Sequence, residues 1–223
     1  MEEQFYLLWP VALLALLAIA RPGIRIAVVV NDMAAVNIDA KLTREVSGMS
    51  NDTVQLQNGC ACCSASEELF VSIEQLIRLS IRRRTRYDYV IIEGSGVSEP
   101  KMIRERFQEA EEQGLPILRL VFLSTMVTVV DAASFPKLFE TRDTVEDRPE
   151  LGVDEYDEGG GERSVVDLLT EQVECADMLV LNKVDLVEAQ GVESLRKVLS
   201  ALNMGAQVRC CEWGKVPLEL VLK

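Results

Sequence analysis

The sequence predicts an α/β fold in which helices flank a mostly parallel sheet. From Ile24 onward, short segments rich in Val, Ile and Leu alternate with longer segments of helical spacing. Such unbroken apolar runs are typical of strands that are covered on both faces. Polar or acidic residues recur directly after these runs, where open parallel sheets bind ligands. With 223 residues, of which 48% are hydrophobic, the chain is long enough for one sizeable core.

The first part of the chain predicts two strands and a helix. A core strand is expected at 24–30 and ends at Asn31 and Asp32. Residues 53–57 alternate between apolar and polar side chains, which predicts a short hairpin strand. Apolar residues recur at helical spacing over 64–82, so a helix is expected there.

A second core strand is predicted at 87–92, followed by the polar segment 93–96. Ser98 is expected to cap the next helix, with Glu99 and Pro100 in its first turn. The remaining predicted elements are strands at 126–130, 178–181 and 207–211 and helices at 165–175 and 191–202. Asp131 is interpreted as a strand-end residue with a structural role.

Charge and histidine content restrict the possible functions. The net charge of -13 argues against a nucleic-acid binder, because Lys and Arg supply most non-specific affinity for phosphates. Residues 140–164 are interpreted as a flexible acidic loop, since ten Asp or Glu face only two Arg between Glu140 and Glu162. The chain has no histidine, which removes the usual general base and the commonest metal ligand.

Three of the six cysteines, Cys60, Cys62 and Cys63, lie within four residues. This spacing does not fit a secreted disulfide framework, so a reducing cytoplasm is expected. The three thiols can converge on one metal ion if the chain turns at Gly59, and thiolates select zinc or Cu(I) over magnesium. The other interpretation is a buried cysteine cluster at a helix start. For the pair Cys210-Cys211, packing is the favoured interpretation.

Asn182-Lys183-Val184-Asp185, directly after the predicted strand 178–181, has the chemistry of a guanine-reading motif. The Asp185 carboxylate can accept both the N1–H and the N2–H groups of guanine, a pattern that adenine does not offer. The Lys183 stem would lie along the purine, and Asn182 would tie neighbouring loops together. The other interpretation is an ordinary loop after a strand.

Four segments occur together in order: 28–32 with Asp39 following, 59–63, 93–100, and 171–172 leading to 182–185. Together they resemble the CobW-type (G3E) P-loop GTPases, a family of metallochaperones, over residues 23–222. The resemblance implies a P-loop NTPase-like fold that binds GTP with Mg²⁺, binds a transition metal at Cys-x-Cys-Cys, and delivers it to a client metalloprotein. It also places Asn31, Asp32 and Asp39 in the first switch region.

By the same resemblance, Glu93 is the acidic residue that orients Mg²⁺ near the γ-phosphate and is the candidate catalytic residue. The other interpretation of Glu93 is a turn cap. Members of this family begin with a strand, a Gly-x-x-Gly-x-Gly-Lys-Thr loop and a helix. This sequence contains no Gly-x-x-x-x-Gly-Lys-[Ser/Thr] stretch, so GTP binding is expected to be weakened or lost and hydrolysis impaired.

Residues 1–22 are expected to be a segment of foreign type in front of an incomplete GTPase domain at 23–223. Residues 1–20 are similar to a motif of membrane acyltransferases of the acyltransferase-3 type. Residues 5–20 are uncharged and mostly apolar, but are shorter than the ~20 residues of a membrane-spanning helix. The favoured interpretation is a gene fusion or misassembled reading frame. The others are a short helix that associates with a membrane, and a helix that replaces the missing strand and helix in the core.

The leading functional prediction is therefore a GTP-binding metallochaperone domain that couples the delivery of a zinc-class metal to GTP. One alternative is a non-catalytic metal-binding or interaction module that has lost nucleotide. The other is a membrane-tethered fragment whose function lies in residues 5–20.

Overall fold

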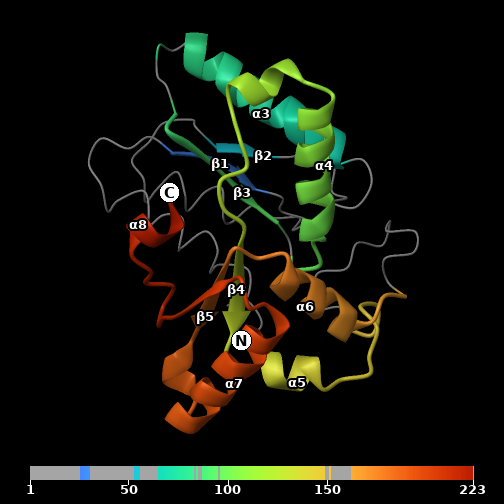
Figure 1. Cartoon of the computed structure of the whole chain (residues 1–223), viewed down its shortest axis with the longest axis vertical. Coiled ribbons are helices and arrows are strands. Elements are labelled where there is room, and N and C mark those ends of the chain that lie inside the picture. Colours follow the sequence, from blue (N-terminus) through green and yellow to red (C-terminus); the bar gives the residue numbers. More distant parts are fainter. Residues whose placement is uncertain are drawn as a thin grey trace.

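The computed structural model describes residues 26–30, 53–55, 65–82, 84, 87–94, 96–148, 151 and 162–222. Among these residues, six parallel strands form two sheets of three, with the strand orders β2-β1-β3 and β4-β5-β6. The helices α3 and α4 lie beside the first sheet, and α5, α6 and α7 lie beside the second (Figure 1). The predicted α/β architecture with parallel strands and flanking helices is thus confirmed, but the described strands form two sheets.

The first sheet consists of β1 (Ile26–Val30), β2 (Thr53–Gln55) and β3 (Tyr89–Glu93). Strand β1 lies in the middle and pairs in parallel with both neighbours, so that Val30 lies opposite Gln55 and Glu93. The hairpin predicted at 53–57 is therefore wrong. A parallel pair needs a crossover of a dozen or more residues, which the segment 31–52 is long enough to provide.

The second sheet consists of β4 (Val127–Asp131), β5 (Met178–Asn182) and β6 (Gln207–Cys210). Strand β5 pairs in parallel with both neighbours and is buried along its whole length. This burial explains why the apolar residues of β5 form an unbroken run, since helices cover both faces of such a strand.

The main helices match the predicted periodicity, and the structure adds short helices that the sequence reasoning missed. The longer helices are α3 (Ala65–Arg82), α4 (Pro100–Glu112), α6 (Val165–Glu174) and α7 (Ala189–Leu202). The short ones are α5 (Phe135–Phe139), α8 (Leu218–Val221) and 3₁₀ turns at Pro116–Arg119 and Val184–Leu186. One cluster of buried side chains joins α3, α4 and their connection to β4 around Leu69, Ile73 and Phe107.

The start of α4 differs from the expectation by one residue. Glu99 occupies the N-cap position, not Ser98, and it makes no capping hydrogen bond through its side chain. The reason is Pro100 at the first helical position, which holds Glu99 in an extended conformation with φ -99 and ψ 93.

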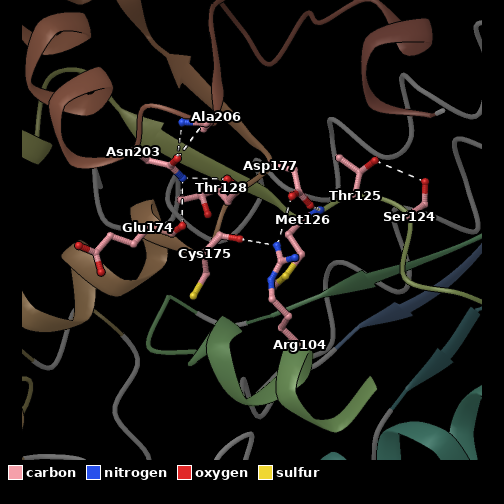
Figure 2. Close-up of polar contacts among 12 residues, drawn as sticks. Arg104, Ser124, Thr125, Met126, Thr128, Glu174, Cys175, Asp177, Asn203 and Ala206 are labelled. Atoms are coloured by element: carbon pink, nitrogen blue, oxygen red, sulfur yellow. Dashed lines mark hydrogen bonds and ion pairs between the residues drawn. The ribbon is translucent and has the colours of Figure 1, made fainter. Parts of the chain in front are cut away.

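Helices, and not strand pairing, provide the described polar links between the two sheets. From α4, Arg104 donates to the carbonyl oxygen of Cys175 at 2.8 Å and to Asp177 at 3.3 Å, next to the start of β5 (Figure 2). From α6, the Gln172 side chain donates to the carbonyl oxygens of Gly96 and Ser98 at 2.8 and 3.0 Å. The loop that follows β3 is thus fastened to a helix of the second sheet.

Arg163 adds a charged link at the same place, because its guanidinium bonds both Glu99 and Glu171. Burial acts to lower the pKa of Arg163, but the hydrogen bonds and negative charges of Glu171 and Glu99 raise it on balance. All three side chains are 30% exposed or less, so solvent screens this triad less than a surface pair.

The described part of the acidic segment is a folded loop. Thr144 pairs with Ser164 in an isolated bridge, and Val145 is buried beside Val165 and Leu168. Hydrogen bonds from the backbone and hydroxyl of Thr144 lower the pKa of the exposed Asp147. Residues 140–148 therefore pack against α6 as a folded turn.

Within the described part of the chain, no helix has both the length and the apolar character needed to cross a bilayer. Residues 5–20, for which a membrane contact is one interpretation, lie outside the described residues.

Asn203, at the end of α7, connects three elements of the second sheet. Its Nδ2 donates to the carbonyl oxygens of Val173, Glu174 and Ala176 at 2.8 to 3.0 Å (Figure 2). Its Oδ1 accepts from the backbone N–H groups of Gly205 and Ala206, both at 3.0 Å. The Asn203 side chain therefore provides hydrogen-bond partners for carbonyl groups at the end of α6 and for N–H groups in the turn into β6.

We expect Asn203→Ala to lower the free energy of unfolding by about 2–3 kcal/mol, because carbonyl and N–H groups lose their partners. Urea denaturation followed by circular dichroism measures the change. The control is Lys197→Ala on the exposed side of α7, expected to stay within about 0.5 kcal/mol of the wild type. Equal stabilities of the two variants would contradict the assigned role.

Candidate functional site

The segment 182–185 begins at the carboxyl end of β5, and its first residue is held rigidly. Asn182 is the last residue of β5 and is 3% exposed. Its side-chain Oδ1 accepts from the backbone N–H of Gly214 at 3.0 Å and from the thiol of Cys211 at 3.4 Å. Asn182 thus joins the loop after β5 to the loop after β6.

Lys183 adopts the left-handed conformation, with φ 59 and ψ 33, and so reverses the chain directly after β5. Its Nζ forms an ion pair with Asp131 Oδ2 at 2.7 Å, and both side chains are 17% exposed. Asp131 lies opposite Asn182 in the strand register and accepts the backbone N–H groups of Ala133 and Ser134 through Oδ1. Lys183 therefore connects the loops after β4 and β5.

Asp185 differs from its neighbours because it is exposed. It lies in the 3₁₀ turn Val184–Leu186, where Leu186 is also 66% exposed. The backbone N–H of Val184 reaches the carbonyl oxygen of Cys211 at 3.4 Å, so the turn lies beside the loop after β6. The Asp185 carboxylate is thus exposed to solvent, while the neighbouring Asn182 is buried and hydrogen-bonded.

The loop after β6 is the second wall of this region. Trp213 and Gly214 both have positive φ, 55° and 65°, and Gly214 is buried while Trp213 is 56% exposed. Burial raises the pKa of the Cys211 thiol to about 11, so Cys211 stays protonated near neutral pH and can donate to Asn182. The packing interpretation is thus confirmed for Cys211, whereas Cys210 is exposed.

Glu93 ends β3 and is partly buried. The turn that follows is tight, since a Cβ atom on Gly94 would lie 2.6 Å from the Ser98 hydroxyl oxygen. Gln172 and the Arg163 triad hold the far side of this turn. Glu93 therefore projects from a strand end whose following loop is fixed by contacts to α6.

The structure brings Asn182 and Lys183 together with partners that sequence reasoning did not assign to them. Asp131 was expected only to have a structural role, and Cys211 only to pack. The signal for Asp131 was its place at the end of the neighbouring strand, because parallel strand ends meet at one edge. Gly214 carried little signal, since a loop contact of this kind has no fixed spacing.

The remaining predicted site residues lie outside the described residues: Asn31, Asp32, Asp39, Cys60, Cys62 and Cys63. Among the residues that the structure does describe, no group of three or more Cys, Asp or Glu is placed to hold a metal ion. The thiolate metal site therefore stays a prediction.

The sequence is similar to known proteins over most of its length. The sequence model described as "CobW/HypB/UreG, nucleotide-binding domain" matches residues 11–209. The chain belongs to the CobW/HypB/UreG family. The matched range begins inside the segment 1–22, and the comparisons give no support to the acyltransferase-like interpretation of residues 1–20.

Two relatives illustrate this membership of the CobW/HypB/UreG family. The chain is 35% identical over 211 residues to the zinc-regulated GTPase metalloprotein activator 1 of Dictyostelium discoideum, covering 90% of this chain and 42% of that protein. It is 29% identical over 212 residues to the zinc chaperone CobW of Pseudomonas aeruginosa, covering 90% of this chain and 52% of the relative. The chain thus spans about half the length of these relatives.

The fold is shared with a solved member of the GTPases. The crystal structure of the Zn(II)-bound YjiA GTPase from E. coli is similar with a TM-score of 0.58 and 18% sequence identity. The similarity covers 95% of this chain and 56% of that one. The chain therefore shares the fold of this GTPase.

We expect Asn182→Ala to free the loop 211–214, because the Gly214 N–H and the Cys211 thiol lose their acceptor. The free energy of unfolding should fall by about 1–3 kcal/mol in urea denaturation. Alkylation of Cys211 by iodoacetamide at pH 8.5, followed by peptide mapping, should become faster, while Cys210 reacts readily in both proteins.

Asp185→Ala is the matched control, because it changes an exposed residue of the same turn. Asp185→Ala should leave the free energy of unfolding and the alkylation rate of Cys211 near the wild-type values. An Asn182→Ala protein with wild-type stability and wild-type Cys211 reactivity would show that this contact does not hold the loop.

Proposed function

We propose that the chain is a GTP-binding metallochaperone domain that binds a zinc-class metal through Cys60, Cys62 and Cys63 and couples its delivery to GTP. The observation that supports this most strongly is the anchored turn 182–185 in a member of the CobW/HypB/UreG family. The names of two relatives, a zinc-regulated GTPase activator and a zinc chaperone, support the metal and the nucleotide. The client metalloprotein is not identified.

Guanine recognition is assigned to Asp185. Its carboxylate accepts two parallel N–H donors, which suits the N1–H and N2–H edge of guanine and not adenine. Asn182 and Lys183 are fixed by Gly214, Cys211 and Asp131, so the turn loses little conformational freedom when a base binds. Asn182 and Lys183 thus position Asp185 relative to the loops after β4 and β6.

The part of the site that would bind the phosphates is less complete than the part that would bind the base. Glu93 fits a magnesium ion, because a partly buried carboxylate at a strand end is the hard oxygen donor that Mg²⁺ prefers. The sequence supplies no Gly-x-x-x-x-Gly-Lys-[Ser/Thr] loop, so the backbone cradle, the Lys on the phosphates and the metal-binding hydroxyl have no counterpart of that type. Impaired hydrolysis of GTP follows from this lack.

The metal is assigned to the three thiols because soft thiolate ligands select zinc-class ions, with a fourth ligand or water completing a tetrahedron. Asn31, Asp32 and Asp39 are assigned to the first switch region, which would connect the nucleotide to the metal. The metal is cargo in this proposal.

A second candidate is a metal-binding or interaction module without nucleotide function. The observation that favours it is the lack of the phosphate-loop motif. The two candidates differ in guanine binding, since only the first requires the Asp185 turn to recognise a base.

We expect the purified chain to bind GTP weakly, in preference to ATP, and Asp185→Asn to lower the GTP affinity about tenfold or more. The amide would present N–H groups to the guanine donors, and losing charged hydrogen bonds costs about 1.5–3 kcal/mol. Affinity for xanthosine triphosphate, which carries an acceptor at position 2, should rise. Isothermal titration calorimetry gives these values.

The control for the nucleotide experiment is Glu188→Gln, which neutralises an exposed carboxylate just after the turn and should not change the GTP affinity. Tight magnesium-dependent GTP binding with ready turnover would refute the weakened phosphate site. Equal affinities for GTP and ATP would refute the role of Asp185.

We expect about one zinc ion per chain and its loss in Cys62→Ser, because the hydroxyl is a poor zinc ligand. Inductively coupled plasma mass spectrometry after dialysis against a weak chelator measures the metal content. Cys210→Ser changes an exposed cysteine outside the motif and should keep the zinc. An unchanged zinc content in Cys62→Ser would refute the proposed metal site.

A further inference from the structure

The described parts of the acidic segment 140–164 contact the loop 94–99 that follows β3. Leu151 of the acidic segment and Val97 of the loop pack against the same buried cluster at the start of α6. The two backbones are also close, because a Cβ atom on Gly96 would lie 3.2 Å from the carbonyl oxygen of Leu151. The acidic segment therefore touches the loop through both backbone and side chains.

Leu151 is itself held in place by a folded turn. Its backbone N–H donates to the carbonyl oxygen of Arg148 at 2.9 Å. The Arg148 guanidinium pairs with Asp143 at 2.6 Å, and Val145 between these two residues is 3% exposed. This turn gives the acidic segment a fixed position from which it supports the loop 94–99.

Arg163 makes the second contact between the acidic segment and the loop. Its guanidinium bonds Glu99 at the end of the loop and Glu171 on α6, and all three side chains are largely buried. Within the described part of the chain, Glu171 Oε1 is buried and has no hydrogen-bond partner. The two carboxylates therefore depend on the charge of Arg163, and without it they would repel each other.

The position of this loop affects Glu93, the residue directly before it. Pairing of β3 with β1 fixes the backbone of Glu93 opposite Val30, whereas the loop 94–99 fixes the chain on the other side. Mg²⁺ demands near-ideal octahedral geometry, so a ligand that moves binds it less well. Replacing a residue that only orients a metal ligand typically weakens metal binding about 10- to 100-fold.

We propose that the acidic segment holds the loop 94–99 in place, and that Arg163 is the positioning residue that keeps the Glu93 carboxylate in position to bind Mg²⁺. The acidic segment does so at two points, through Leu151 and through Arg163. The role toward Mg²⁺ rests on the proposed function, in which Glu93 holds this ion beside GTP. The contacts with the loop are independent of nucleotide.

Calorimetric titration of Arg163→Met with GTP at a series of Mg²⁺ concentrations tests the role toward Mg²⁺. We expect Arg163→Met to raise, about tenfold or more, the Mg²⁺ concentration that gives half of the magnesium-dependent gain in GTP affinity. The affinity for guanosine, which has no phosphate groups to share a metal ion, should stay within about twofold of the wild type. A general loss of stability would weaken both ligands.

Backbone ¹⁵N relaxation of the nucleotide-free protein tests the contacts alone. In Arg163→Met, repulsion between Glu99 and Glu171 should push the loop away from α6. The order parameters of the amides at 96–98 should then fall from about 0.85 to below about 0.6, while those of β5 stay near about 0.85. Adding Glu99→Gln to Arg163→Met removes the repulsion and should restore the rigid values, which a purely steric role of Arg163 would not produce.

Arg142→Met is the matched control, because it removes an exposed positive charge from the same acidic segment. It should leave the Mg²⁺ response and the order parameters at their wild-type values. If Arg163→Met does not fold, Leu151→Ala takes its place. Leu151→Ala keeps the ion pairs of Arg163 but shortens the apolar contact beside Val97, so it should make the amides at 96–98 mobile as well.

Wild-type GTP binding that does not respond to Mg²⁺ would refute the proposed magnesium site and, with it, the role of Arg163 toward the ion. The order parameters would then decide whether the acidic segment holds the loop. A wild-type Mg²⁺ response that Arg163→Met leaves unchanged would refute the positioning role of Arg163 and leave the proposed function intact. Rigid amides at 96–98 in Arg163→Met, or in Leu151→Ala where that variant replaces it, would overturn the support by the acidic segment.

Discussion

The complete burial of β5 between β4 and β6 is the constraint on which the candidate site depends. A strand buried on both faces leaves no solvent for the amide of Asn182 at its end, so this group must find partners within the protein. It finds them in Gly214 and Cys211 of the loop after β6. Lys183 then turns toward Asp131, and one strand end fixes the loops of three strands.

A second consequence concerns the loop after Glu93. Helix α6 packs on the second sheet through Val173 and Leu169, and the same helix holds Gly96 and Ser98 through Gln172. The loop that follows the candidate magnesium residue Glu93 is therefore held by the same helix that packs on the sheet carrying the candidate base-reading turn. Arg104 strengthens this connection from α4.

The sequence predicted the repeated strands and helices well, because covered strands such as 178–182 have unbroken apolar runs and α3, α6 and α7 have helical periodicity. It mistook β2 for a hairpin strand, because a short alternating segment does not reveal its partner. The motif 182–185 was visible as residue types in a strand context. The contacts that hold it, Asp131 to Lys183 and Gly214 to Asn182, depend on strand register and loop geometry, which no local pattern records.

The most direct test of a preformed base-reading site uses a nucleoside, since guanosine has no phosphate groups and does not depend on a phosphate loop. In ¹H–¹⁵N NMR spectra, millimolar guanosine should shift the amide signals of Asp185 and Gly214, with little change in β4 and β5. Adenosine at the same concentration should leave both signals in place. Equal shifts with the two nucleosides, or no shift of either signal with guanosine, would contradict guanine recognition by this turn.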